Sequence, residues 1–153
     1  MTPLVSNLWP QFMVDPAFAA CFGQVIVEHA QMLRQERQVI FTLRSGAPLD
    51  KNLCARLLAS LQPDYEGFEL RIQNLFGYAM LDETALRDLM EEMKRDGVPI
   101  NGFLDRCKIN IIGQKITIGV CHGTKFLQEM HFEKLLAERI AAHTGVTPQI
   151  TLQ

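Results

Sequence analysis

The sequence predicts an α+β fold made of two small hairpin-helix-strand modules joined by a connector helix. Two segments show the apolar alternation of half-buried strands, and each is followed by a helical stretch and a short closing strand. This order runs from 25 to 72 and again from 107 to 152. We therefore expect a first module at 1–75, the connector at 76–103 and a second, truncated module at 104–153.

The first module is expected to combine an aromatic N-terminal cap with a small sheet. The rings of the cap are Trp9, Phe12, Phe18 and Phe22. Val39, Phe41 and Leu43 alternate with outward positions, which is typical of a strand with one buried face. A helical stretch begins at Leu49, and an alternating strand at 68–72 closes the module.

The connector has clear start and stop signals. Asp82 opens it, Arg95 lies in its last turn and Gly97 stops it, so its charges suit the helix dipole. Its apolar residues recur at helical spacing: Leu86, Leu89, Met90 and Met93. Glu91 and Glu92 are interpreted as a solvated helix face, because surface helices are normally charged on one side.

The second module repeats the pattern of the first. Ile116, Ile118 and Val120 alternate as a strand, and a helical stretch begins at Phe126. The spacing from Ile116 to Phe126 equals that from Val39 to Leu49 in the first module. Ile150 lies in the closing strand. Each module would be a three-stranded sheet with a helix on one face.

Composition narrows the class of protein. With 48% apolar and 21% charged residues, the 153-residue chain has a globular composition. A net charge of −2 gives no general attraction to nucleic acid. We find neither a membrane-length apolar run nor a signal-peptide pattern, and therefore expect a cytoplasmic protein without membrane contact. The four cysteines are widely spaced and are expected to be free thiols.

The search for chemistry gives few candidates. No phosphate-binding loop, dinucleotide turn, zinc-protease helix or nucleophile elbow occurs, so we expect no enzyme activity and no cofactor in this chain. Cys121 beside His122 is the best nucleophile candidate, but neighbouring strand residues point to opposite faces. The histidines share no metal-ligand spacing, and no metal site is expected. They are His29, His122, His131 and His143.

Basic residues near the two hairpins form a tentative surface for a partner or for nucleic acid. Arg34, Arg37 and Arg44 surround the first hairpin, and Lys108 and Lys115 flank the Gly113-Gln114 turn. A hairpin-helix-strand unit is similar to nucleic-acid-binding modules of the KH type. KH recognition needs a GXXG loop that clamps the backbone, and no such loop occurs at either helix. Ordinary solubilising charges remain the simpler interpretation.

Most of the chain after about Val25 resembles the N-terminal region of PolC-type DNA polymerase III alpha subunits. In the first half the resemblance is carried by RQVIFTL at 37–43, by the amphipathic stretch 49–61 and by the strand 68–72. In the second half it is carried by Leu104, KIN at 108–110, Gly113, ITIGV at 116–120, Phe126-Leu127 and the helix through 140–145.

The resemblance implies a non-catalytic fragment of a much larger replicative polymerase, whose polymerase and 3'-5' exonuclease parts lie elsewhere. In that family this region is thought to dock the C-terminal domain of the tau clamp-loader subunit, and its second module is KH-like without a clamp loop. Tau or another replisome protein is the expected partner in DNA replication.

Two alternatives stay open. One is a degenerate KH-like module that contacts single-stranded or primer-template DNA through Lys108, Lys115 and the first-hairpin arginines. The other is a small enzyme with a cysteine site at Cys121.

Overall fold

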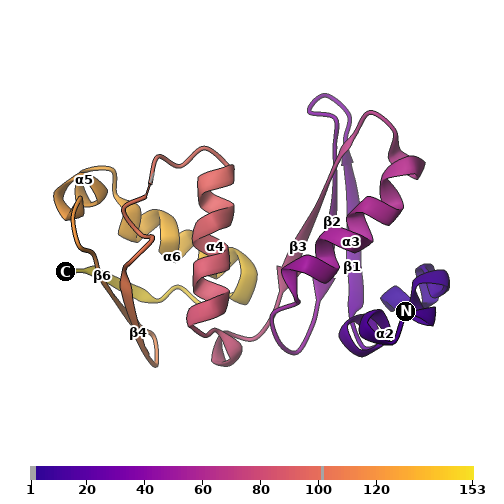
Figure 1. The fold of residues 1–153 in the computed structure, drawn as a ribbon, viewed down its shortest axis with the longest axis horizontal. Helices are drawn as coiled ribbons and strands as arrows, with labels where there is room; N and C mark the ends of the chain where they lie inside the picture. The colour runs from indigo at the N-terminus through magenta and orange to yellow at the C-terminus, as the bar shows by residue number, and fades with distance from the viewer. Residues whose placement is uncertain (1–2, 101) are drawn as a thin grey trace. The chain divides into compact units, whose positions relative to one another are not determined.

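The computed structural model describes residues 3–100 and 102–153, and the chain divides into two compact units, Met1–Phe76 and Gly77–Gln153. Each unit has its own three-stranded sheet accompanied by helices, so the α+β prediction is confirmed (Figure 1). The expected connector is a helix, but it belongs to the second unit. Among the described residues, no helix combines the length and the apolar character needed to cross a membrane.

The first unit contains the predicted hairpin, helix and strand behind a helical N-terminal segment. Its elements are α1 (Val5–Leu8), η1 (Pro10–Val14), α2 (Pro16–Phe22), β1 (Ile26–Leu33), β2 (Gln38–Arg44), α3 (Lys51–Leu61), η2 (Gln62–Tyr65) and β3 (Glu69–Leu75). The sheet order is β1-β2-β3. The β1/β2 pair is antiparallel and the β2/β3 pair is parallel.

The core of the first unit lies on one face of this sheet. Val39, Phe41 and Leu43 of β2 are at most 3% exposed, as their alternation predicts. The ring of Phe41 meets Trp9 edge-on at 5.5 Å and Tyr65 at 5.8 Å between ring centroids. The aromatic N-terminal segment therefore packs against the sheet as the expected cap.

Asp50 is the N-cap of α3, and its removal should weaken the first unit. Its Oδ1 accepts the backbone N–H groups of Asn52 at 2.8 Å and Leu53 at 3.1 Å. Without that cap both donors lose their partner, so Asp50→Ala should cost about 1 kcal/mol of unfolding free energy. Urea denaturation followed by circular dichroism measures this. Asp64→Ala, an exposed acid beyond the helix, is the control, and an equal loss in both variants would contradict the capping role.

The second unit repeats the topology of the first. Its elements are η3 (Tyr78–Met80), α4 (Glu83–Arg95), β4 (Lys108–Ile112), β5 (Lys115–Gly119), α5 (Thr124–Glu129), α6 (Phe132–Thr144) and β6 (Gln149–Leu152). The sheet order is β4-β5-β6, antiparallel and then parallel. Ile116 and Ile118, on either side of the central residue of β5, are fully buried.

The duplication extends to the register of the strands. The directly opposed triplets at the sheet centres are Ala30, Phe41, Ile72 in the first unit and Ile109, Ile118, Leu152 in the second. One difference lies in the helical segment: the second unit has two helices where one was expected. They break at Met130 and His131, and His131 has a left-handed φ of 60°.

Candidate functional site

The three arginines of the first hairpin do not form the expected cluster. Arg34 and Arg37 lie in the turn between β1 and β2, whereas Arg44 is the last residue of β2, at the other end of the strand. The Arg44 guanidinium is paired with Glu28, with 2.5 Å between Nε and Oε1. Only Arg34 and Arg37 therefore share one end of the sheet.

Lys108 and Lys115 are exposed, but they lie at opposite ends of the second hairpin. Lys108 is opposite Gly119, and Lys115 is opposite Ile112. These positions are four residue steps apart, which corresponds to about 14 Å along the strand. Their sheet face also carries the opposed polar residues Asn110, Thr117 and Thr151. This face is polar without being a concentrated positive patch.

The structure does not bring Cys121 and His122 together as a nucleophile and its base. Cys121 is exposed, and its Sγ lies 3.9 Å from the carbonyl oxygen of Arg106. The His122 ring instead packs edge-on against Phe103, with ring centroids 5.5 Å apart. The two side chains thus have different neighbours.

The other cysteines are kept protonated by burial. Burial raises the pKa of Cys54 to about 12, and it also raises the pKa of Cys21 and of Cys107. A thiol with a raised pKa is a poor nucleophile and a poor metal ligand at neutral pH. Within residues 3–100 and 102–153, no group of three or more His, Cys, Asp and Glu side chains could hold a metal ion.

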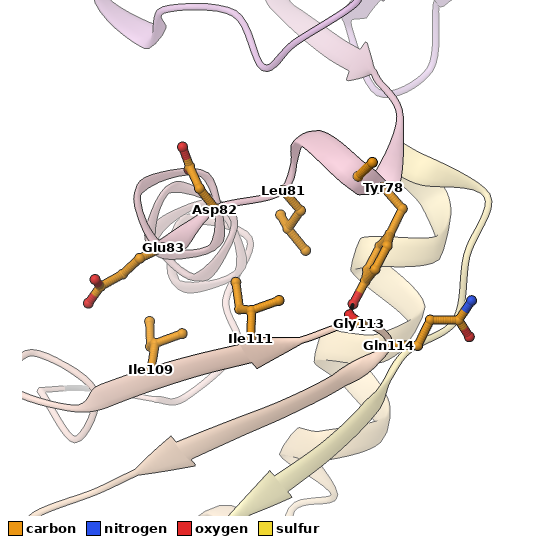
Figure 2. A pocket seen from close by; sticks show the side chains of 9 residues that line it. Tyr78, Leu81, Asp82, Glu83, Ile109, Ile111, Gly113 and Gln114 are labelled. Carbon is orange, nitrogen blue, oxygen red and sulfur yellow. Dashed lines mark hydrogen bonds between the residues drawn. The ribbon is translucent and has the colours of Figure 1, made fainter.

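A groove lies beside β4 in the second unit, and we call it the β4 groove. It is a shallow, open hollow with a volume of about 650 Å³. Figure 2 shows it between the start of α4 and the edge strand β4. The lining residues are Tyr78, Ala79, Leu81, Asp82, Glu83, Ile109, Ile111, Gly113 and Gln114.

The apolar floor of the β4 groove follows from the position of β4 at the sheet edge. Ile109 and Ile111 are opposite Ile118 and Ile116, so all four side chains share one face. The two β5 residues are fully buried, whereas Ile109 and Ile111 are only half-buried. The core layer therefore continues into the groove as partly uncovered apolar surface.

Tyr78 closes one end of the groove. Its hydroxyl donates a hydrogen bond to the Gly113 carbonyl oxygen at 2.5 Å, which ties η3 to the β4–β5 turn. Gly113 has a φ of 58° and is the first residue of the two-residue loop, a position that favours glycine. Burial raises the pKa of Tyr78, so this hydroxyl keeps its proton at neutral pH.

The rim of the β4 groove is acidic. Asp82 and Glu83 are both exposed at the start of α4. Asp82 Oδ1 caps the helix by accepting the Ala85 N–H at 2.8 Å, and Glu83 Oε1 pairs with Arg87 at 2.8 Å. Two carboxylates against one guanidinium leave a local excess of negative charge.

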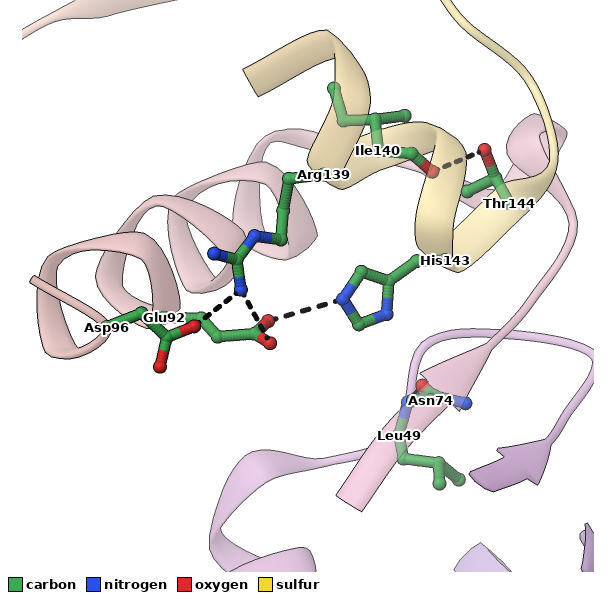
Figure 3. Close-up of polar contacts among 8 residues, drawn as sticks. All are labelled: Leu49, Asn74, Glu92, Asp96, Arg139, Ile140, His143 and Thr144. Carbon is green, nitrogen blue, oxygen red and sulfur yellow. Dashed lines mark hydrogen bonds and ion pairs between the residues drawn. The ribbon is translucent and has the colours of Figure 1, made fainter. Parts of the chain in front are cut away.

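A charge cluster that we call the α4–α6 clamp lies elsewhere in the second unit (Figure 3). Arg139 lies 3.1 Å from Glu92 and 2.7 Å from Asp96, while His143 Nε2 lies 3.3 Å from Glu92. The prediction of a solvated Glu92 was wrong, because this side chain is only 22% exposed. Glu91 is exposed as expected.

Sequence spacing could have found the clamp. Glu92 of α4 and its C-cap residue Asp96 are four residues apart, and Arg139 and His143 are four apart on α6, so each pair lies on one side of its helix. Acidic and basic pairs of equal spacing indicate facing helices. The clamp holds these helices together and therefore has a structural role.

Comparisons with known proteins add no assignment to these features. No protein-family model matches the sequence, and searches of curated proteins and of solved structures likewise give no significant match.

Proposed function

We propose that this chain is a non-catalytic docking module that binds a partner protein in DNA replication. The observation that carries the proposal is the β4 groove, where half-buried isoleucines line an open hollow of about 650 Å³ along an edge strand. Apolar grooves and open sheet edges are common protein-binding surfaces. The proposal puts the chain in the bacterial cytoplasm.

The resemblance to PolC N-terminal regions is the basis on which we choose the partner protein. We propose the C-terminal domain of the tau clamp-loader subunit, which would link the polymerase to the replisome. The order α4-β4-β5-α5-α6-β6 supports the KH-like interpretation of the second unit. Met130 and His131 occupy the junction of its two helices, where a KH clamp would need glycines. This junction favours a protein partner over a nucleic acid.

The DNA-binding alternative rests on the five basic residues. Because Arg44 is paired with Glu28 and the two lysines stand about 14 Å apart, they offer few adjacent phosphate contacts. We therefore keep DNA contact as the second candidate.

Calorimetric titration distinguishes the two candidates. The chain should bind the tau C-terminal domain saturably, with one site and little dependence on salt, and bind single-stranded or primed DNA at least tenfold more weakly. The control is Lys108→Gln with Lys115→Gln, which should leave tau binding unchanged because neither lysine lines the β4 groove. DNA binding that weakens steeply with salt and is lost in this variant, without tau binding, would replace the docking proposal.

A further inference from the structure

We infer that the β4 edge takes up an extended segment of a partner protein as an added strand. The segment would place apolar side chains at alternate positions toward the β4 groove and a basic residue at the acidic rim. The inference rests on the proposed function for there being a protein partner, but not for the partner's identity.

The backbone of β4 offers donors and acceptors along its open side. The two-residue Gly113-Gln114 loop makes Ile112 and Lys115 directly opposed, and such a loop closes on a hydrogen-bonded pair. Hydrogen-bonded and non-bonded pairs alternate along an antiparallel ladder, so Asn110 bonds toward β5. The N–H and C=O groups of Ile109 and Ile111 then point away from β5. Within the described residues, no strand pairs with that side.

Ile109 and Ile111 offer both unpaired backbone groups and apolar side chains to a partner. The backbone groups of Ile109 and Ile111 lie on the open side of β4, and their side chains line the groove together with Leu81. An added strand would bond to the backbone, and its alternate side chains would bury this apolar surface (Figure 2). A helix could cover the side chains but would leave the backbone groups unpaired. The geometry therefore favours an extended occupant.

The β1 edge of the first unit shows how an edge is protected from such pairing. Its start is covered by the N-terminal segment, with the Val5 N–H donating to Val25 O at 2.8 Å. A register shift follows Val27, and Glu28, His29 and Gln31 are exposed polar residues of this strand. Bulges and charged residues are devices that keep edges single. The β4 register is regular, and Ile109, Ile111 and Ile112 dominate the strand.

The negative charge at the rim of the β4 groove indicates which charged residue the partner's segment should carry. Asp82 and Glu83 lie at the edge of the groove, and the Glu83 side chain is 57% exposed although it pairs with Arg87. A Lys or Arg next to the apolar positions would complement this excess of negative charge. On the open sheet face, the 68% exposed Ile112 would gain a neighbour from the added strand.

Panning a phage-displayed library of random nonapeptides against the folded full chain tests this inference. Enriched peptides should alternate apolar and polar residues and carry Lys or Arg beside the apolar positions. Ile111→Lys places a charge in the groove and should lower retention of these peptides at least tenfold. Thr117→Lys adds the same charge on the central strand β5, where Thr117 points to the open face away from the groove, and should retain them.

A second variant keeps the test valid if Ile111→Lys fails to fold. Glu83→Lys reverses an exposed rim charge and should lower retention of the basic peptides at least threefold, whereas Glu91→Lys, on an exposed part of the same helix, should not. Enrichment of helical three- and four-residue spacings, no enrichment at all, or equal retention by Glu83→Lys would overturn the inference. So would a dimer of the chain that Ile111→Lys dissociates, because a second copy would then occupy the edge.

This result is separable from the titration with tau. Enrichment of the expected peptides without tau binding supports the β4 edge and removes only the named partner. Tau binding that survives Ile111→Lys and Glu83→Lys supports docking and overturns the β4 assignment.

Discussion

Replacing Ile118 by alanine should lower the unfolding free energy of the second unit by about 2–5 kcal/mol. Ile118 is fully buried on the central strand β5, directly opposite Ile109 on one side and Leu152 on the other. The substitution removes three buried carbon atoms and leaves a cavity among side chains that the two neighbouring strands hold in register. Urea denaturation followed through NMR signals of β5 measures the loss.

Thr117→Ala is the matched control for this variant. Thr117 is the preceding residue on the same strand and points to the open polar face, so its replacement should cost less than about 1 kcal/mol. Equal losses in the two variants would mean that the described sheet face is not the core of the second unit.

Glu92→Gln should destabilise the second unit by about 2 kcal/mol at pH 7, because charge-assisted hydrogen bonds of the α4–α6 clamp are lost. Burial alone would raise the pKa of Glu92. The hydrogen bond from His143 and the charge of Arg139 outweigh burial and hold the pKa below its usual value of 4.5. The carboxylate therefore binds its proton less readily in the folded state.

The sign of the pH dependence follows from this shift. A carboxyl whose pKa is lower in the folded than in the unfolded state stabilises the fold above the unfolded pKa. That contribution is lost as the pH falls from about 4.5 through the folded pKa. Thermal unfolding of the wild type should thus weaken over this window more than that of Glu92→Gln.

Glu91→Gln serves as the control, because Glu91 is exposed on the same helix and has no role in the clamp. It should keep the stability and the pH profile of the wild type. A Glu92→Gln variant as stable as the Glu91→Gln variant at pH 7 would show that the clamp does not hold α4 to α6.

Apolar periodicity predicted the sheets well because each strand buries one face. Val39, Phe41 and Leu43 in the first unit and Ile116 and Ile118 in the second all occupy the expected buried positions. Their alternation is a direct consequence of strand geometry and needs no knowledge of the partner strands. The duplicated order could therefore be inferred from local pattern alone.

Features that depend on tertiary contacts were harder to predict from the sequence. The helical break at His131 has neither glycine nor proline to signal it, and its left-handed φ is held by the two helices that it joins. The prediction of a solvated Glu92 was wrong because Arg139 and His143, far along the sequence, face it in the fold. The matching four-residue spacing of the acidic and the basic pair was the available signal, but it does not say which helices meet. The helix at 83–95 was predicted correctly, but its membership of the second unit depends on such contacts.

In the candidate site, too, local pattern identified some residues, whereas their arrangement depends on tertiary contacts. The sequence drew attention to arginines and lysines near the hairpins, yet Arg44 lies away from Arg34 and Arg37 at the other end of its strand. The β4 groove depends on which strand forms an edge and on how far α4 covers it. From the sequence alone, Ile109 and Ile111 would be predicted as ordinary core residues, but the structure leaves them partly exposed.

Amide hydrogen exchange at β4 tests the central claim most directly. In the free chain, the amides of Ile109 and Ile111 should exchange rapidly, while those of Asn110 and Ile112, bonded to β5, exchange slowly. Saturation with a tau C-terminal domain or with an enriched peptide should slow Ile109 and Ile111 and leave Asn110 unchanged. Slow exchange of Ile109 and Ile111 already in the free chain, or no slowing on binding, would contradict the account of β4 as an open docking edge.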